Sequence, residues 1–176
     1  MKQATWFRRV TRCAMALSLA LSVACSQGGN EATPPQDTRT TVSPNGEGPS
    51  PPGRLKIVSA TASGGTETAA FVFDHDLLTG WNSGGFAPGW IQLDLGQPIA
   101  LTRVRLLTMQ SPPGPTRHQI LGGLTPDSLA LLGTLEGDTA AGQWLELQVK
   151  GQVRYLKIET LKSPSWVAWA EIEVYE

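Results

Sequence analysis

The sequence predicts an all-β fold for residues 54–176, an antiparallel sandwich or barrel of short strands. Apolar and polar residues alternate with period two in several short runs, and Gly, Pro and Asp separate these runs. No stretch has the three-and-four apolar spacing of a long helix. About 120 residues are enough to build one hydrophobic core without disulfides or metals.

Five runs show the alternation most clearly. Because successive side chains of a strand point to opposite faces, each run places its apolar residues on one face. The runs are Ile91–Leu95, Val104–Leu106, Leu145–Val149, Leu156–Ile158 and Ala170–Val174. Four tryptophans flank or lie on the predicted strands, so we expect them to pack in the core or at its rim: Trp81, Trp90, Trp144 and Trp169.

Charge and cysteine content argue against nucleic-acid binding and against a thiolate metal site. The chain of 176 residues carries 14 Lys and Arg against 15 Asp and Glu. Removal of residues 1–24 would leave ten cations against the same fifteen acids, a net charge near −5, which disfavours nucleic-acid binding. Both cysteines, Cys13 and Cys25, precede the predicted domain, which therefore has no disulfide and no thiolate metal site.

The amino end reads as an export signal. Residues 1–12 are basic, and the apolar run that follows, Ala14–Val23, is too short for a membrane span of ~20 residues. Leu21–Cys25 resembles a bacterial lipobox, although Ser22 stands where Leu is preferred. That resemblance implies a signal peptide over residues 1–24, lipidation of Cys25 and, because Ser26 follows, sorting to the outer membrane of the cell envelope. The alternative is ordinary cleavage after Ala24.

Residues 25–53 are expected to form a disordered tether between this anchor and the domain. The segment from Ser26 to Gly53 holds six Pro and five Gly, with Ala32 and Val42 as its only aliphatic residues. Such a segment cannot bury enough apolar surface to offset the entropy of ordering. A purely passive or cleaved spacer is the alternative.

Four blocks of residues 54–176 together resemble a known family. They are Asp74–Trp81, Gly89–Gly96, Arg154–Ile158 and Ala170–Tyr175. In order and spacing they are similar to the discoidin domain, also called the coagulation factor 5/8 type C domain, and to carbohydrate-binding module family 32. The resemblance implies a galactose-binding-like jelly-roll β-sandwich of about eight strands, with its termini at one end and its ligand loops at the other.

A short polar segment offers oxygen ligands for a cation. Asp74, Asp76 and Thr79 place three oxygen-bearing side chains within six residues, and calcium binds oxygen ligands. The resemblance implies a structural calcium ion held by these residues, with Glu171 from the last strand closing the site. The alternative is that Asp74 and Thr79 only cap turns.

The loops opposite the termini are the expected ligand face. The last hairpin, residues 161–168, exposes Trp166 among turn residues, and a flat aromatic ring can cover the apolar face of a sugar. Four polar side chains near the loops could read its hydroxyl groups: Arg117, His118, Asn82 and Gln110. The sugar-binding relatives likewise combine an aromatic residue of this loop with Arg, His and Asn. Alternatively, Trp166 folds back as a lid and His118 only begins a strand.

We therefore interpret the chain as a non-catalytic, membrane-anchored recognition module that binds a glycan. A protein-protein adaptor or assembly domain without a sugar ligand is the alternative, because discoidin-like domains also bind proteins and fold does not fix function. An enzyme is disfavoured: the chain has no Gly-x-Ser-x-Gly and no His-Glu-x-x-His motif, and only two histidines. A lipid-binding role would rest on Phe86 and Trp166, with little cationic support nearby.

Overall fold

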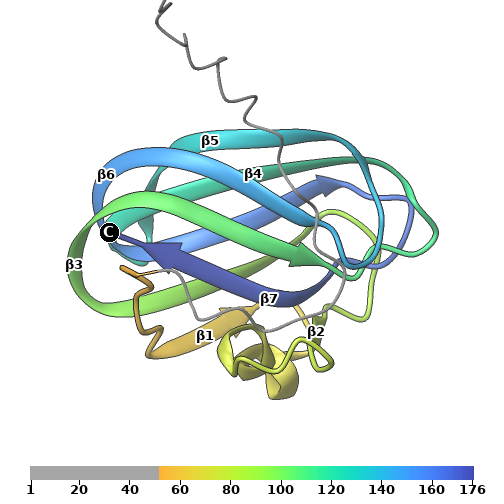
Figure 1. Cartoon of the computed structure of the whole chain (residues 1–176), viewed down its shortest axis with the longest axis horizontal. Helices are drawn as coiled ribbons and strands as arrows, with labels where there is room; N and C mark the ends of the chain where they lie inside the picture. The colour runs from red at the N-terminus through yellow and green to blue at the C-terminus, as the bar shows by residue number, and fades with distance from the viewer. Residues whose placement is uncertain (1–51) are drawn as a thin grey trace, which may run out of the picture. The chain divides into compact units, whose positions relative to one another are not determined.

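The computed structural model describes residues 52–176, so the signal peptide, Cys25 and all but the end of the predicted tether lie outside it. The described residues form seven strands and one short 3-10 helix, η1 (Figure 1). The elements are β1 (Ser59–Ala62), η1 (Thr66–Phe73), β2 (Trp81–Asn82), β3 (Gly89–Thr108), β4 (Gly114–Thr125), β5 (Ser128–Thr139), β6 (Trp144–Lys162) and β7 (Ala168–Tyr175).

Two long strands, β3 and β6, build both layers of an antiparallel sandwich. The first part of β3, residues 89–94, pairs with β1 and with the second part of β6, which also pairs with β4. After an irregularity in register between Asp94 and Ile99, the rest of β3 pairs with β7 and with the first part of β6. The full order is β2-β7-β3-β6-β4-β5, with β1 also beside β3.

The predicted all-β sandwich is confirmed, with seven strands where about eight were expected. The predicted runs Ile91–Leu95 and Val104–Leu106 are two parts of the single strand β3. Likewise, Leu145–Val149 and Leu156–Ile158 are two parts of β6. Each alternating run was located correctly, but backbone pairing continues across the bend that separates its members.

The core lies between the two layers and consists of the apolar residues of the alternating runs. Its fully buried members include Ile91, Leu93, Val104, Leu106, Leu156, Ile158, Ile172 and Val174. Trp81 and Trp169 are buried as expected. Trp90 and Trp144 are half-buried, with the Lys157 ammonium over the first ring and the Arg105 guanidinium over the second.

The helix η1 covers one edge of the core and was not predicted from the sequence. Its residues Ala69 and Val72 are buried. The preceding residue, Gly65, has φ of 60°, and a Cβ there would lie 2.1 Å from the carbonyl oxygen of Asn82. Glycine is therefore required where the chain passes from β1 to the helix.

The first and last residues of the domain meet at one end of the sandwich, and the loop before β7 lies at the opposite end. Arg54 forms a bridge with Tyr175, and Leu55 N donates to Val174 O at 2.8 Å. Strand β7 runs toward this end, so its first residue, Ala168, and the loop before it lie at the far end (Figure 1). Residues 52–176 contain no helix long and apolar enough to cross a membrane.

Candidate functional site

Three loops enclose a groove of about 330 Å³ at the end of the sandwich opposite Arg54 and Tyr175. They connect β2 to β3, β3 to β4 and β6 to β7. The groove is lined by three apolar side chains, Phe86, Met109 and Trp166. Polar side chains come from Asn82, Ser111 and Ser165, and Pro112, Pro164 and Ala168 complete the lining.

Trp166 is accessible in this groove and is not folded back as a lid. Its residue exposure is 49%, and the other apolar members, Phe86 and Met109, are 64% and 41% exposed. The backbone beside Trp166 is fixed, because Ser83 N donates to Val167 O at 2.9 Å and Val167 N donates to Gly85 O at 3.0 Å. These bonds join the first and third loops next to Trp166.

Gln110 supports the groove from beneath. It is only 7% exposed. Its Nε2 donates to Pro112 O at 3.2 Å, and its Oε1 accepts a hydrogen bond from Ser163 Oγ at 3.0 Å. One side chain thus joins the second and third loops. Both ends of its amide are engaged by protein and it is not among the lining residues of the groove, so this position does not support its predicted role as a ligand contact.

His118 does not reach the groove. It is 3% exposed on β4, its Nδ1 lies 2.9 Å from Thr160 Oγ1, and its ring meets the Trp169 ring edge-on at 4.8 Å. Burial lowers the pKa of His118 to about 4. The predicted sugar-donor role for His118 is not supported by this position, because strand alternation turns its side chain inward.

His118 lines a separate, small cavity. Its volume is about 10 Å³, and Gln110, His118 and Trp169 are among its lining residues. His118 Nε2 and Trp169 Nε1 are buried and have no hydrogen-bond partner among the described residues. This volume is about that of one water molecule and is too small for a sugar.

Arg117 also lies apart from the groove, whereas Asn82 lines it. The Arg117 side chain is 48% exposed, and its Nε lies 3.6 Å from Glu136 Oε2 on the neighbouring strand β5. Asn82 Oδ1 accepts a hydrogen bond from Gly84 N at 2.9 Å. Of the five predicted ligand residues, Trp166 and Asn82 line the groove together.

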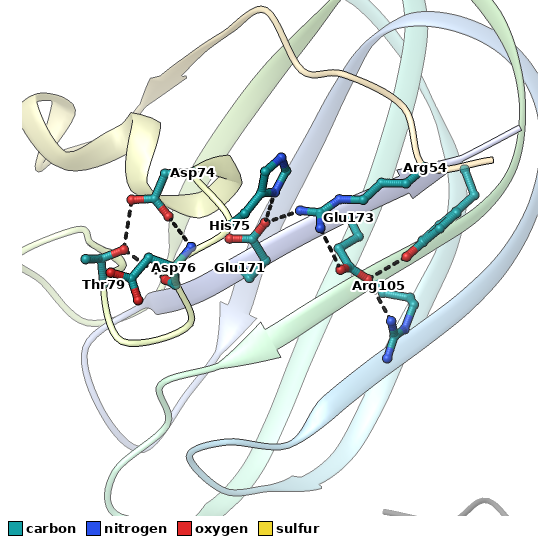
Figure 2. A network of polar contacts seen from close by, with 9 residues as sticks. Arg54, Asp74, His75, Asp76, Thr79, Arg105, Glu171 and Glu173 are labelled. Carbon is teal, nitrogen blue, oxygen red and sulfur yellow. Dashed lines mark hydrogen bonds and ion pairs between the residues drawn. The ribbon is translucent and has the colours of Figure 1, made fainter. Parts of the chain in front are cut away.

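Asp74, Asp76 and Thr79 form one turn beside β7 (Figure 2). Thr79 Oγ1 donates to Asp74 Oδ2 at 2.9 Å, and Asp74 Oδ1 accepts from Asp76 N at 2.9 Å. Asp76 Oδ1 accepts from Leu78 N at 2.9 Å. Both carboxylates therefore stabilise the turn, as the capping alternative requires. His75 adopts φ of 72°, a left-handed conformation that is uncommon outside glycine.

Glu171 lies next to this turn and is completely buried (Figure 2). Its Oε1 accepts from the Arg54 guanidinium and lies 3.4 Å from His75 Nδ1, while its Oε2 has no hydrogen-bond partner among the described residues. Burial raises the pKa of Glu171 to about 7; the Arg54 guanidinium opposes this rise, and the Asp74 and Glu173 carboxylates add to it.

A hard cation beside Glu171 would need more ligands than the carboxylates of this region supply. A buried carboxylate oxygen without a partner needs either a hydrogen-bond donor or a positive charge. Within residues 52–176, no three His, Cys, Asp or Glu side chains gather closely enough to hold a metal ion by themselves. A calcium ion at Asp74 and Glu171 would therefore also need the Thr79 hydroxyl and backbone carbonyls, which are ordinary calcium ligands.

Arg54 is a residue of this region that sequence reasoning missed. Besides Glu171, it contacts Glu173 through Nη1 at 3.1 Å, and Glu173 also accepts from Arg105 at 2.7 Å and from the Tyr175 hydroxyl at 2.6 Å (Figure 2). This network covers the outer face of β7. It explains why the carboxylates that alternate with the core residues of β7 are buried.

Phe86 and Met109 were also missed as ligand-site residues. In the sequence, Phe86 is a candidate only for lipid binding. The approach of Phe86 and Met109 to Trp166 depends on three loops far apart in sequence meeting at one end. Large apolar residues inside turn-rich segments were the available signal, since such residues have no strand face on which to be buried.

Comparison with known proteins rests on structure, because no family model and no curated protein matches the sequence. The CBM32 of AlyQ in complex with 4,5-unsaturated mannuronic acid has a TM-score of 0.60 and 20% identity, covering 70% of this chain and 98% of that one. A pectin-binding carbohydrate-binding module gives 0.60 and 21%, with coverage of 69% and 92%. The family 32 CBM from C. perfringens NanJ in complex with galactose gives 0.59 and 16%, with coverage of 70% and 98%.

A truncated AlyQ that contains CBM32 and alginate lyase domains matches with a TM-score of 0.62 and 20% identity. The match covers 70% of this chain but only 33% of that one, so it corresponds to part of a larger protein. The complete modules are covered almost end to end. The fold of this chain is therefore the discoidin-like, galactose-binding-like β-sandwich of the family 32 carbohydrate-binding modules.

Proposed function

We propose that residues 54–176 form a non-catalytic carbohydrate-binding module whose ligand site is the groove beside Trp166. The exposed indole at the edge of an open groove is the observation that carries this proposal. Modules of similar fold that bind mannuronic acid, pectin or galactose support it. None of the nine lining residues is an acid or a base, so the groove has no group for proton transfer.

Binding would combine stacking with a few hydrogen bonds. The Trp166 ring offers an apolar face to the C–H face of a sugar. Asn82, Ser111 and Ser165 supply amide and hydroxyl groups at the rim of the groove. Because the groove is open and the contacts are few, we expect affinity of the order of millimolar, about −4 kcal/mol.

A glycan array tests the proposal, using a soluble chain that begins at Ser26. We expect the wild type to bind at least one glycan and Trp166→Ala to lose that binding. Leu78→Ala is the matched control, because Leu78 is 94% exposed but does not line the groove. Absence of glycan binding by the wild type, together with capture of a defined protein that Trp166→Ala no longer captures, would favour the adaptor instead.

The proposed attachment to the cell envelope depends on Cys25, which lies outside the described residues. We propose that Cys25 is lipidated and that the module faces its ligand from a membrane surface, at the outer membrane. Incorporation of radiolabelled palmitate in the native host, lost in Cys25→Ala, is the expected result. Equal labelling of both chains would refute the anchor without affecting the sugar site.

We also propose a structural calcium ion held by Asp74, Asp76, Thr79 and Glu171. Bound calcium would supply the positive charge that the unpartnered oxygen of Glu171 lacks, and it would hold the turn against β7. Added calcium should raise the melting temperature of the wild type by about 5 °C relative to chelator.

Two variants control the calcium experiment. Asp74→Asn should abolish the shift, because it weakens a carboxylate at the proposed site. Asp127→Asn should keep it, because Asp127 is an exposed acid of the turn between β4 and β5. The calcium proposal fails if the wild type melts at the same temperature with chelator and with calcium.

A further inference from the structure

The groove beside Trp166 is built without charge. Its nine lining residues include no Lys, Arg, Asp, Glu or His. The cations nearest to its loops in sequence, Arg117 and Lys162, stand opposite each other on β4 and β6 and are not among the lining residues. Arg117 is also close to Glu136, so its charge is already partly compensated.

The groove lining offers no cation to the carboxylate of an acidic sugar. A carboxylate that leaves water needs a cation or several strong donors, and an unpaired one is costly to bury. The polar side chains available are neutral: Asn82, Ser111 and Ser165. Asn82 Oδ1 already accepts from Gly84 N, and Ser165 Oγ already donates to Trp166 O at 3.2 Å. What remains suits hydroxyl groups rather than a full negative charge.

The same groove has more apolar surface than a single stacking platform requires. Phe86 and Met109 come from the other two loops and are 64% and 41% exposed beside Trp166. Covering apolar surface is favourable by about 25 cal/mol per Å². A methyl-bearing substituent would therefore gain contact with Phe86 and Met109 while the sugar ring lies on the indole.

We propose that this groove selects an uncharged sugar that carries a small apolar substituent, such as a methyl ester, an acetyl group or a 6-deoxy carbon. This inference rests on the proposed function and specifies its ligand class. It assigns the sugar ring to Trp166 and the substituent to Phe86 and Met109. The neutral lining sets the preference against uronates.

The experiment compares matched sugars on one protein. Galacturonan and mannuronan oligosaccharides are tested as sodium salts, as full methyl esters and after reduction to neutral hexoses, beside an array of N-acetylated and 6-deoxy sugars. Affinity is read from the shift of the Trp166 indole N–H in NMR titrations of the chain that begins at Ser26. We expect the tightest uncharged, substituted sugar to bind at least about tenfold more tightly than any uronate.

A charge placed in the groove gives a second, independent test. Ser165→Lys should raise affinity for the uronate salts by about tenfold at low salt, and this gain should fall as ionic strength rises. Leu131→Lys is the matched control, because Leu131 is 55% exposed on β5, outside the groove, and the change in net charge is the same. It should leave uronate binding unchanged.

The outcomes distinguish a failure of the claim about ligand class from a failure of the proposed carbohydrate-binding function. A uronate bound as tightly as the best uncharged sugar overturns the claim about charge. Unsubstituted hexoses bound as tightly as their substituted partners overturn the claim about Phe86 and Met109. In both cases the carbohydrate-binding function stands. If no sugar of any class shifts the indole signal, the proposed function itself fails.

Discussion

The buried position of His118 predicts how the stability of the domain depends on pH. Burial lowers the pKa of this imidazole from its ordinary value of 6.5 to about 4 in the folded protein. Its Nδ1 contacts Thr160 and its ring packs against Trp169, so a proton added to the folded state would place a charge in the core. The unfolded chain takes up that proton near pH 6.5.

The sign and size of the effect follow from linkage. Because the folded pKa is the lower one, the contribution of His118 is complete above about pH 6.5 and falls as the pH drops toward about 4. Between pH 7.5 and pH 5.0, two pKa values near 6.5 and 4 correspond to a loss of about 2 kcal/mol of unfolding free energy. Such a loss is a large fraction of the stability of a small domain.

Urea unfolding at these two pH values, on wild type, His118→Asn and His75→Asn, measures the effect. His118→Asn lowers stability at both pH values but should remove about 2 kcal/mol of the difference between them. His75→Asn is the control, since the His75 side chain is 64% exposed and Asn tolerates its left-handed backbone. Carboxylates contribute equally to the wild type and to His118→Asn and cancel in that pair, whereas His75→Asn also removes the contact between His75 and Glu171.

The reasoning is refuted if His118→Asn retains the full pH dependence of the wild type. An independent check is the pKa of His118 read from its imidazole NMR signals. A value near 6.5 would mean that the ring is reached by water, which would restore it as a candidate ligand residue. A value near 4 would place it in the core.

Three further outcomes are expected. Arg54→Ala should lower the free energy of unfolding by about 3 kcal/mol, measured by urea unfolding with chelator present. The substitution removes the cation that the buried carboxylates of Glu171 and Glu173 share. A loss below about 1 kcal/mol would refute this. Gly64→Ala should lower the free energy of unfolding by about 1–3 kcal/mol, because the new Cβ would lie 2.3 Å from Ser83 O. At Gly85 a Cβ meets no atom within 4 Å, so Gly85→Ala should lower the melting temperature less than Gly64→Ala does. Gln110→Ala should cost more free energy of glycan binding than free energy of unfolding. A larger loss of unfolding free energy than of binding free energy would contradict a positioning role for Gln110.

The strands could be predicted from the sequence because period-two alternation is a local signal. It located the buried faces of Leu93, Leu106, Leu156 and Ile172 correctly. It could not show that two runs belong to one bent strand, because the bend is set by pairing with distant partners. The helix η1 is a short 3-10 segment, whose pattern is too brief for periodicity to detect.

The candidate site was predicted less well, because it depends on which strand face a residue occupies and on contacts between segments far apart in sequence. His118 lies between Thr116 and Ile120, and all three are buried on one face of β4, so the same alternation that located the strands could have placed the imidazole inside. Alternation could not show that Glu171 is buried, because Arg54 reaches it from a segment 117 residues away. The meeting of Phe86 with Trp166 likewise depends on loop conformations that no local pattern specifies.

The passage of β3 and β6 through both layers has a consequence for how the domain comes apart. Neither layer can peel away while the other persists, because the same two backbones cross both. Hydrogen exchange should therefore report one slow, all-or-none opening for the central amides, with faster exchange confined to the short peripheral strands. One of these is β2, a pair of residues whose strand partner is β7, and it carries Asn82. The proposed recognition surface therefore includes a residue of the shortest strand beside the indole of Trp166.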